Sequence, residues 1–514
     1  MDKNILKWNF VFQYGWVLTN IFNTILLFPL YLHNIDKNTL GVWLATGNIL
    51  GWMTLVDPGV GEVLQQKIAE LSGRKENAEI GKSIGSGMIA SFFILIIAVT
   101  LGYVSYFFIG RLIAKDVTQY PHLSSALVLS VIATGMSLVS FSMSGINQGL
   151  HNSAQVAICA LIANFVFLFV NLLFLYVGYG VLSIAIANFA RALFLNIYNI
   201  FSMLKVLKKQ SIPIILEFLH FKRFIRIFSF TSTSKIISGL AYSVDMIVLA
   251  RFITPAMITV YETNKRPVNV TYSLIGRHSV ALMPLISHSK GMGEKASIIN
   301  LINTQFRFYS YATLFASFLF LLNFENLINA WTGKGNFAGN LILYLLVSNF
   351  FFTLLCTFMA NIGYALGDIK INSLFNIIRN VCYGVLMFFA ARSFGIIGTL
   401  VVALLMTITA DFFFYNYRVY KLGYLEMSLL KSSVIPWAII IPISLLAGYG
   451  VKKLVEHLVP VNMYFTKLII NTGFFTLFFI CLVLLADRQF REIIKKVLHK
   501  YILPVITRFT KNEF

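Results

Sequence analysis

Apolar residues dominate the chain in long runs, and short polar segments separate one run from the next. Fourteen of these runs are long enough for a helix that crosses a membrane, which needs about 20 residues. They cover residues 10–32, 40–64, 84–109, 123–147, 155–177, 181–204, 228–252, 257–285, 304–322, 337–363, 371–391, 395–417, 433–450 and 465–486. The pattern predicts an all-α polytopic membrane protein with about 14 transmembrane helices.

The composition agrees with this prediction. The chain has 514 residues, of which 58% are apolar and only 12% are charged, and its mean hydropathy is +0.78. A soluble domain carries about 25% charged residues, so this chain cannot cover a water-facing surface and a soluble enzyme is excluded. The first run exceeds the apolar core of a signal peptide and predicts an uncleaved first span. All four cysteines lie in apolar runs, and no disulfide is predicted.

Charge predicts the orientation of the chain. It carries 41 Lys and Arg residues and 20 Asp and Glu residues, which gives a net charge of +21. With the N-terminus in the cytoplasm, 25 basic residues fall in cytoplasmic segments and seven in segments on the other side. Because basic residues concentrate in cytoplasmic loops, both termini are predicted to be cytoplasmic. The loops account for most of the charge, so nucleic acid is not predicted as a partner.

The sequence repeats weakly between its two halves. Residues around Val42 match those around Val260 at a shift of 218, the segment 145–150 matches 361–366 at 216, and Tyr179-Gly180 matches Phe394-Gly395 at 215. An even number of spans in each half inserts both halves the same way up. The repeat therefore predicts two six-helix lobes, related by a pseudo-twofold axis around a central cavity, and two further C-terminal helices.

The predicted domain boundaries follow from the spans and the repeat. They are an N-terminal lobe over 1–204, a basic cytoplasmic linker over 205–227, a C-terminal lobe over 228–420, two extra helices within 421–486, and a basic cytoplasmic tail over 487–514.

Three segments carry a resemblance to a known superfamily. They are Leu-Val-Asp-Pro-Gly-Val-Gly at 55–61 with its continuation to Glu70, the segment 235–251 with Tyr-Ser-Val-Asp at 242–245, and the segment from Val260-Tyr261 through Pro284-Leu285-Ile286 to Gly291. With the span count and the repeat, they make the chain resemble the multidrug/oligosaccharidyl-lipid/polysaccharide (MOP) exporter superfamily. Within it, the chain is most similar to the polysaccharide transporter branch of Wzx-type O-antigen flippases.

The resemblance implies a flippase in the bacterial inner (plasma) membrane. Its substrate would be an undecaprenyl-diphosphate-linked oligosaccharide, which is a repeat unit of O-antigen, capsule or exopolysaccharide. Alternating access would move this polyprenyl-diphosphate-linked unit from the cytoplasmic to the periplasmic leaflet of the lipid bilayer. The resemblance implies a functional monomer, an association with glycan polymerase machinery, and no cofactor beyond a coupling H⁺ or Na⁺.

Three other functions stay open at this point. A lipid II flippase of the same superfamily has cationic residues in its first span, whereas the run 10–32 has no charge. A cation-coupled multidrug exporter needs an acidic cavity. A membrane enzyme needs a catalytic motif, and the sequence has no nucleophile elbow, HExxH or Walker motif and only scattered histidines, so neither catalysis nor a metal site is predicted.

Basic residues inside the predicted spans are the candidates for binding a diphosphate, because Arg and Lys bind phosphate well. They are Arg191, Lys235, Lys265, Arg266, Arg277 and Arg379. Glu262 lies three and four residues before Lys265 and Arg266, so the three share one helix face with a positive excess. Arg251, Arg307 and Lys467 lie near span ends, and we expect these to reach the membrane interface.

Acidic residues inside the spans are fewer than basic ones, whereas amide residues are many. Asp57, Asp245, Asp411 and Glu262 are candidates for ion coupling or for a counter-ion role. Most of the many asparagines are expected to form hydrogen bonds between helices.

Overall fold

The computed structural model describes residues 3–53, 60–74, 76–150, 152–217, 244–426, 431–432, 434–460 and 462–497. Within these ranges every regular element is helical, and nine helical segments are long and apolar enough to cross a membrane. Each of the fourteen predicted runs overlaps a described helix. The prediction of an all-α, multi-pass membrane protein is confirmed.

The chain divides into two compact units. Unit 1 contains residues 1–262 and 380–395, and unit 2 contains residues 263–379 and 396–514. The lobe, linker and tail boundaries that the sequence predicts stay a prediction.

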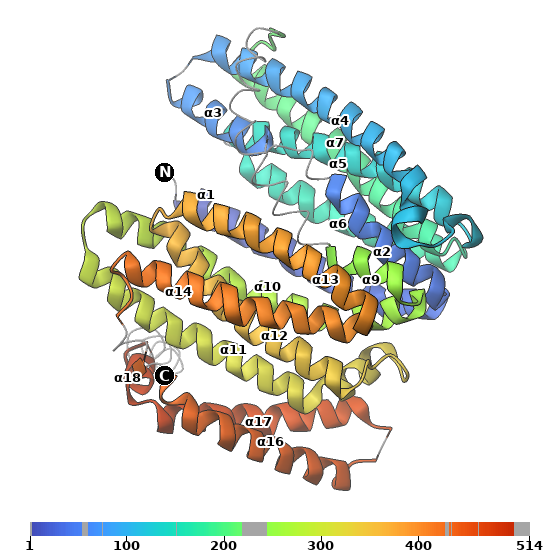
Figure 1. Ribbon diagram of the computed structural model, residues 1–514. Coiled ribbons are helices and arrows are strands. Elements are labelled where there is room, and N and C mark those ends of the chain that lie inside the picture. Colours follow the sequence, from blue (N-terminus) through green and yellow to red (C-terminus); the bar gives the residue numbers. More distant parts are fainter. Residues whose placement is uncertain are drawn as a thin grey trace, which may run out of the picture. The chain divides into compact units, whose positions relative to one another are not determined.

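Unit 1 is built around helix α5 (Figure 1). Its helices are α1 (Lys3–Asn34), α2 (Lys37–Met53), α3 (Val60–Arg74), α4 (Asn77–Ile113), the single turn η2 (Val117–Gln119), α5 (Leu123–Gly149), α6 (Ser153–Tyr176), α7 (Val181–Gln210) and α9 (Val244–Phe252). Helix α5 packs against α3, α4 and α7. Glycine makes the closest of these approaches, because a Cβ on Gly145 would lie 2.1 Å from the carbonyl oxygen of Gly61.

Asparagine side chains join the helices of unit 1, as the sequence predicts. Asn23 donates to the carbonyl oxygen of Asn164 at 3.1 Å, and Asn164 donates to Thr19 Oγ1 at 2.9 Å, which joins α1 to α6. Asn171 donates to the hydroxyl of Tyr31 at 2.7 Å between the same two helices. These bonds satisfy polar groups that hydrocarbon cannot satisfy.

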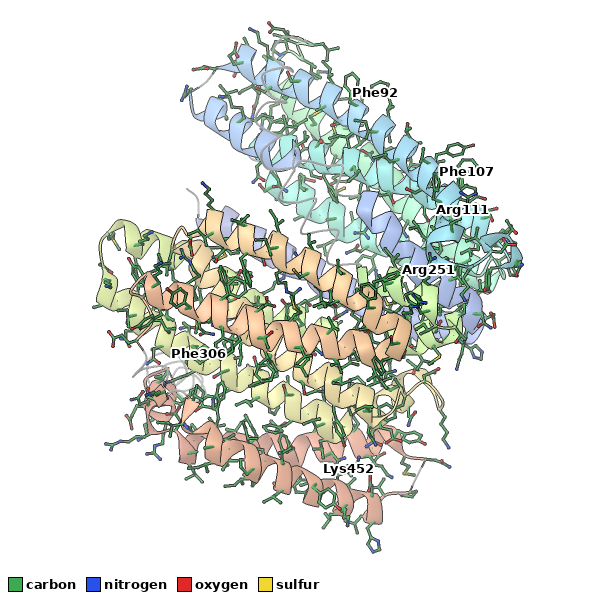
Figure 2. All side chains as sticks on the ribbon, viewed as in Figure 1. Phe92, Phe107, Arg111, Arg251, Phe306 and Lys452 are labelled. Carbon is green, nitrogen blue, oxygen red and sulfur yellow. The ribbon has the colours of Figure 1, made fainter. Side chains whose placement is uncertain are left out.

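The outer face of α4 is apolar and exposed. Phe92 and Phe107 are 62% and 60% exposed and point outward from the unit (Figure 2). Large apolar side chains in such a row mark the surface that lipid covers in a membrane protein.

Residues 205–210 of the predicted linker are the end of α7, and the next residues of the linker lie against α4. The segment 211–217 has no helix, and the Ile215 amide donates to the carbonyl oxygen of Gly81 at 3.2 Å. A Cβ on Gly81 or Gly85 would lie about 2 Å from the Pro213 or Ile215 carbonyl oxygen (2.0 and 2.1 Å). The two glycines, four residues apart, therefore form the flat helix face on which this segment rests.

Unit 2 has helix α11 between two layers (Figure 1). Its helices are α10 (Pro255–Gly291, which begins in unit 1), α11 (Lys295–Thr332), α12 (Asn340–Ala365), α13 (Ile369–Met406), the π-helical η3 (Thr407–Asp411), α14 (Phe412–Lys421), α16 (Trp437–Leu458), α17 (Tyr464–Ala486) and α18 (Arg488–Val497). Helix α11 packs on α12 with Phe306 against Phe358, and on α17 with Phe318 against Phe475.

Local geometry repeats at the shifts that the sequence predicts. Two pairs of backbone hydrogen bonds correspond at shifts of 218 and 216. They are Glu76 N to Leu71 O with Glu294 N to Ser289 O, and Leu150 N to Ile146 O with Leu366 N to Ile362 O, all of 2.9–3.1 Å. At a shift of 215, Gly180 has φ 52° and ψ −128°, and Gly395 has φ 55° and ψ −133°. Because side chains rarely adopt this region, a match at both positions supports the repeat.

Gly395 also explains one difference between sequence and structure. Helix α13 continues across Gly395, but the dihedral angles of this glycine break it into the two spans predicted as 371–391 and 395–417. The predicted run 40–64, by contrast, falls on two helices, α2 and α3.

Candidate functional site

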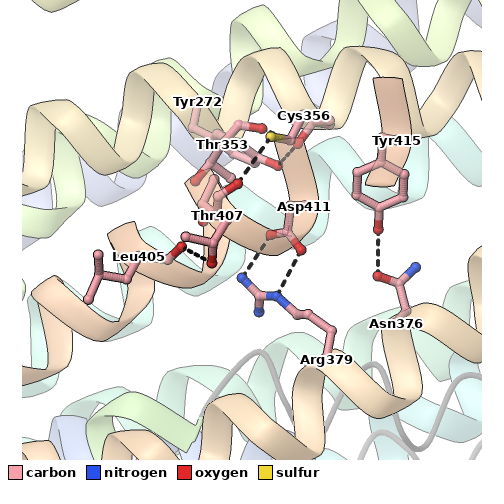
Figure 3. Close-up of polar contacts among 11 residues, drawn as sticks. Tyr272, Thr353, Cys356, Asn376, Arg379, Leu405, Thr407, Asp411 and Tyr415 are labelled. Atoms are coloured by element: carbon pink, nitrogen blue, oxygen red, sulfur yellow. Dashed lines mark hydrogen bonds and ion pairs between the residues drawn. The ribbon is translucent and has the colours of Figure 1, made fainter. Parts of the chain in front are cut away.

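An ion pair lies inside the helices of unit 2. Arg379 of α13 donates from Nε to Asp411 Oδ1 at 3.1 Å and from Nη2 to Asp411 Oδ2 at 3.0 Å (Figure 3). The side chains are 18% and 12% exposed. A two-pronged guanidinium–carboxylate bond fixes both the distance and the plane of the partners. The structure therefore brings together two residues that the sequence singled out separately.

A π-helical turn presents Asp411 to Arg379. In η3 the Phe412 amide bonds to the carbonyl oxygen of Thr407, which is five residues earlier. The wider turn leaves the Thr407 carbonyl facing α12, where the Cys356 thiol lies 3.8 Å from it. Such turns are rare and occur frequently at functional sites.

Three further contacts join α13 to α14 beyond the ion pair. Phe375 and Phe414 stack with ring centroids 3.6 Å apart, and the Tyr415 hydroxyl donates to Asn376 Oδ1 at 2.7 Å. At the start of α13, the Asp368 carboxylate accepts hydrogen bonds from Arg418 Nε and Nη2 at 2.6 and 2.7 Å. The contacts run antiparallel, so Arg379 and Asp411 belong to a continuous seam of aromatic, amide and charged pairs.

Sequence reasoning missed the Asp368–Arg418 pair. Asp368 precedes α13 directly and Arg418 lies in the last turn of α14. Both residues lie outside the predicted spans, in segments that the sequence pattern assigns to loops. The sequence does hold a signal for this pair. Asp368 precedes one predicted span and Arg418 follows the next, and these two ends of consecutive antiparallel spans lie on the same side of the membrane.

Helix α10 carries charge along its length. Glu262, Lys265 and Arg266 are each half-buried, and each has interactions with its surroundings. Arg277 is exposed, and no hydrogen bond or ion pair joins it to any residue in the described ranges. The neighbouring His278 Nε2 lies 2.8 Å from Gln305 Oε1 of α11. Arg277 is therefore a cation that an outside anion can reach.

Arg191 is a second cation of this kind. It lies in α7 of unit 1 and is half-buried. Among the residues that the structure describes, it has neither an ion pair nor a hydrogen bond. A guanidinium at this depth in an apolar helix costs free energy, which is the usual mark of a group kept for function.

Three other predicted residues have different outcomes. Asp245 lies in the first turn of α9 and is half-buried with interactions of its own. Lys235 and Asp57 lie outside the described residues. The predicted roles of all three stay predictions.

Arg307 does not extend outward to solvent, as a side chain that reaches for the membrane interface would. It is 1% exposed and forms an ion pair with Asp487, which is 3% exposed. Its other terminal nitrogen, Nη2, bonds to Ser432 Oγ at 2.9 Å and to Gln489 Oε1 at 2.6 Å. Acceptors from two segments, Ser432 and the start of α18, explain why the side chain turns inward. Lys467 is also buried, at 6% exposed, whereas Arg251 is exposed and donates to the Arg111 carbonyl (Figure 2).

Metal-ligating residues do not gather in the part of the chain that the structure describes. No group of three His, Cys, Asp or Glu side chains lies close enough there to hold an ion.

Comparison with solved structures identifies the fold. The lipid II flippase MurJ in an inward closed conformation matches with a TM-score of 0.66 and 16% identity, over 93% of this chain and 98% of that chain. A multidrug resistance MATE family transporter of the MOP superfamily, inward-facing, matches at 0.64 and 14% identity, over 78% and 95%. A mutant of the MATE transporter VcmN of Vibrio cholerae matches at 0.56 and 14% identity, over 81% and 98%.

The chain has a MOP-type transporter fold. No protein-family model and no curated protein sequence matches the chain. At 14–16% identity the likeness concerns the fold, and it extends over nearly the whole length of each of these transporters. The MurJ match covers more of this chain than the two MATE matches do, with 93% against 78% and 81%.

Proposed function

We propose that the chain is a flippase for a lipid-linked, anionic sugar. Its substrate is an undecaprenyl-diphosphate-linked oligosaccharide, and alternating access carries the head group from the cytoplasmic to the periplasmic leaflet. The observation that carries this proposal is the pair of cations, Arg191 and Arg277, that have no acidic partner among the described residues. A transporter of cationic substrates would need acidic residues without a basic partner.

The substrate fits these cations chemically. A diphosphate offers several oxygens to guanidinium groups, which bind phosphate with two parallel hydrogen bonds. Arg191 of unit 1 and Arg277 of unit 2 would each offer a guanidinium to phosphate oxygens, and the polyprenyl tail would stay in the lipid. Arg379 is held by Asp411, so we assign it a smaller share of phosphate binding than the sequence predicts.

A lipid II flippase is the second candidate. The fold likeness to the lipid II flippase MurJ, over 93% of this chain, favours it. A multidrug exporter, like the MATE transporters that match, is the third, and the two cations argue against it. We place the protein in the bacterial inner membrane with both termini in the cytoplasm, acting as a monomer beside the glycan polymerase machinery. Asp57 or Asp245 would serve a coupling H⁺ or Na⁺.

The test is deletion of the gene in its host, followed by complementation. We expect the deletion strain to lose surface glycan and to accumulate undecaprenyl-diphosphate oligosaccharide, as measured by blotting and by mass spectrometry of lipid extracts. The wild-type gene restores both. Arg191→Ala and Arg277→Ala, at normal expression, lower the surface glycan at least tenfold.

Arg251→Ala is the matched control, because Arg251 is exposed at the end of α9 and bonds only a backbone carbonyl among the contacts resolved for it. It should complement fully. Accumulation of lipid II in place of the oligosaccharide would establish the second candidate. Unchanged glycan with increased sensitivity to cationic drugs would overturn the proposal in favour of an exporter.

A further inference from the structure

A short charged helix follows the last membrane span directly. Helix α17 ends at Ala486 and α18 begins at Arg488, so Asp487 alone joins them. Asp487 is extended, with φ −113° and ψ 99°, and the chain changes direction there. A helix that begins one residue after a span starts at the level of the membrane surface.

A buried polar cluster fixes the start of this helix. The Asp487 carboxylate accepts hydrogen bonds from Arg307 and from the Tyr311 hydroxyl, the latter at 2.6 Å. Its other oxygen, Oδ1, accepts from the Phe490 amide at 3.0 Å and so caps the first turn of α18. Since Arg307 also binds Gln489 of α18, α11 holds both the bend at Asp487 and the first turn of α18.

The apolar residues of α18 face the protein. Phe490 packs edge-on against Phe308 and Tyr311 of α11, with ring centroids 4.9 Å apart in each pair. Ile493 and Ile494, three and four residues further on, are half-buried. This spacing is that of an amphipathic helix with one apolar stripe.

Exposed charges occupy the remaining surface of α18. Its sequence carries four basic residues (Arg488, Arg491, Lys495, Lys496) and one acidic residue, Glu492. Arg491 is half-buried and donates to the Leu484 carbonyl oxygen at 3.4 Å. Arg488 is exposed, and Lys495 is 62% exposed with Glu492 3.6 Å away. Such an exposed ion pair is weak, so it leaves Lys495 available to another anion. Lys431, also exposed, adjoins Ser432, to which Arg307 bonds, and so lies at the same end of unit 2.

We propose that α18 is a binding surface for anionic phospholipid head groups of the surrounding bilayer. Because the apolar stripe of α18 packs on α11, the helix would bind anionic head groups through its exposed basic residues, each of which is attracted to a negatively charged membrane surface. The buried Arg307–Asp487 cluster holds the charged face at the height of the head groups, so no ordering of the helix is needed on binding. The proposal stands independently of the transported substrate.

Hydrogen exchange of the full-length protein in nanodiscs tests the proposal. We compare phosphatidylcholine alone with phosphatidylcholine that contains 30% phosphatidylglycerol, and follow the peptide over 488–497. One basic residue near an anionic surface contributes about fivefold in binding. We therefore expect exchange in α18 to slow at least fivefold with phosphatidylglycerol, and to return to the neutral-lipid rate in high salt.

The variant Arg488→Glu with Lys495→Glu should abolish this lipid dependence. Lys452→Glu with Lys453→Glu is the matched control, because it changes the net charge equally on α16 (Figure 2 labels Lys452) and should keep the wild-type response. Equal exchange in both lipids, or equal loss in both variants, would overturn the proposal. So would protection that appears only on addition of a cytosolic protein extract, which would make α18 a protein-binding surface.

Discussion

At the residue scale, two buried ion pairs of unit 2 each act as a single neutral element. Arg379 with Asp411, and Arg307 with Asp487, each combine one full charge of either sign. Taking two charges out of water together costs far less than burying one alone. Arg191 and Arg277 differ from them, because their charge has no compensation in the described structure.

Replacement of Arg379 by alanine should destabilise the protein. The change leaves the Asp411 carboxylate inside apolar helices without its counter-ion, which costs about 3 kcal/mol. The free energy of unfolding of purified protein in an SDS titration measures the effect. In the double variant Arg379→Met with Asp411→Leu most of the loss should be recovered, and a double variant as unstable as the single one would contradict the pairing.

Replacement of Arg191 by methionine should not lower the free energy of unfolding, in contrast to Arg379→Ala. Methionine has a similar length and removes a charge that costs about 2.5–3.5 kcal/mol at the centre of a membrane. We expect the free energy of unfolding in the same titration to stay equal or to rise, while transport falls. A loss as large as that of Arg379→Ala would mean that Arg191 has a structural partner.

At the element scale, the sequence predicted helices well and their interruptions poorly. Apolar runs fix where a span lies, because about 20 apolar residues are needed whatever the packing. The π turn at Thr407–Asp411, and with it the contact between Asp411 and Arg379, depends on residues 32 positions apart that pack in three dimensions. The predicted tail contains helix α18, and the spacing of Phe490, Ile493 and Ile494 is the sequence pattern that indicates an amphipathic helix there.

Substitution on the glycine face of α4 should release the linker segment. A Cβ on Gly81 would lie 2.0 Å from the Pro213 carbonyl oxygen, so Gly81→Ala forces residues 211–217 away from the helix. We expect hydrogen exchange of this segment to quicken about tenfold, because the Ile215 amide loses its bond to Gly81.

Gly450→Ala on α16 is the control for the linker experiment, since a Cβ there meets no atom within 4 Å. It should leave exchange in the segment 211–217 unchanged. Unchanged exchange in Gly81→Ala as well would show that the segment does not rest on this glycine in solution.

At the scale of the whole molecule, the all-α multi-pass architecture and the internal repeat followed from span count and pattern, whereas the expectation of a MOP-type fold came from a resemblance carried by three segments. The candidate site followed only in part. Sequence identified Arg379 and Asp411 as charges within spans, yet could not pair them, and it left Arg307 without its partners because it considered one helix at a time. The Asp487 partner belongs to a different helix junction, 180 residues away.

The repeat makes equal predictions for two distant glycines. Gly180 and Gly395 have φ and ψ values that differ by no more than a few degrees, in a region that costs other residues about 1–3 kcal/mol. Gly180→Ala and Gly395→Ala should therefore lower the free energy of unfolding by similar amounts in the SDS titration. Gly384→Ala, in an open part of α13, should be neutral or slightly stabilising.

The matched glycines also bear on how the chain arose. The same unusual backbone conformation occurs twice, 215 residues apart, and helix ends elsewhere match at nearly the same shift. Common descent of the two halves explains this more simply than two independent origins. A gene for an even number of spans can be copied in tandem without turning the second copy over in the membrane. Duplication of one gene segment accounts for this match, and α16, α17 and α18 lie beyond the second of the two predicted lobes.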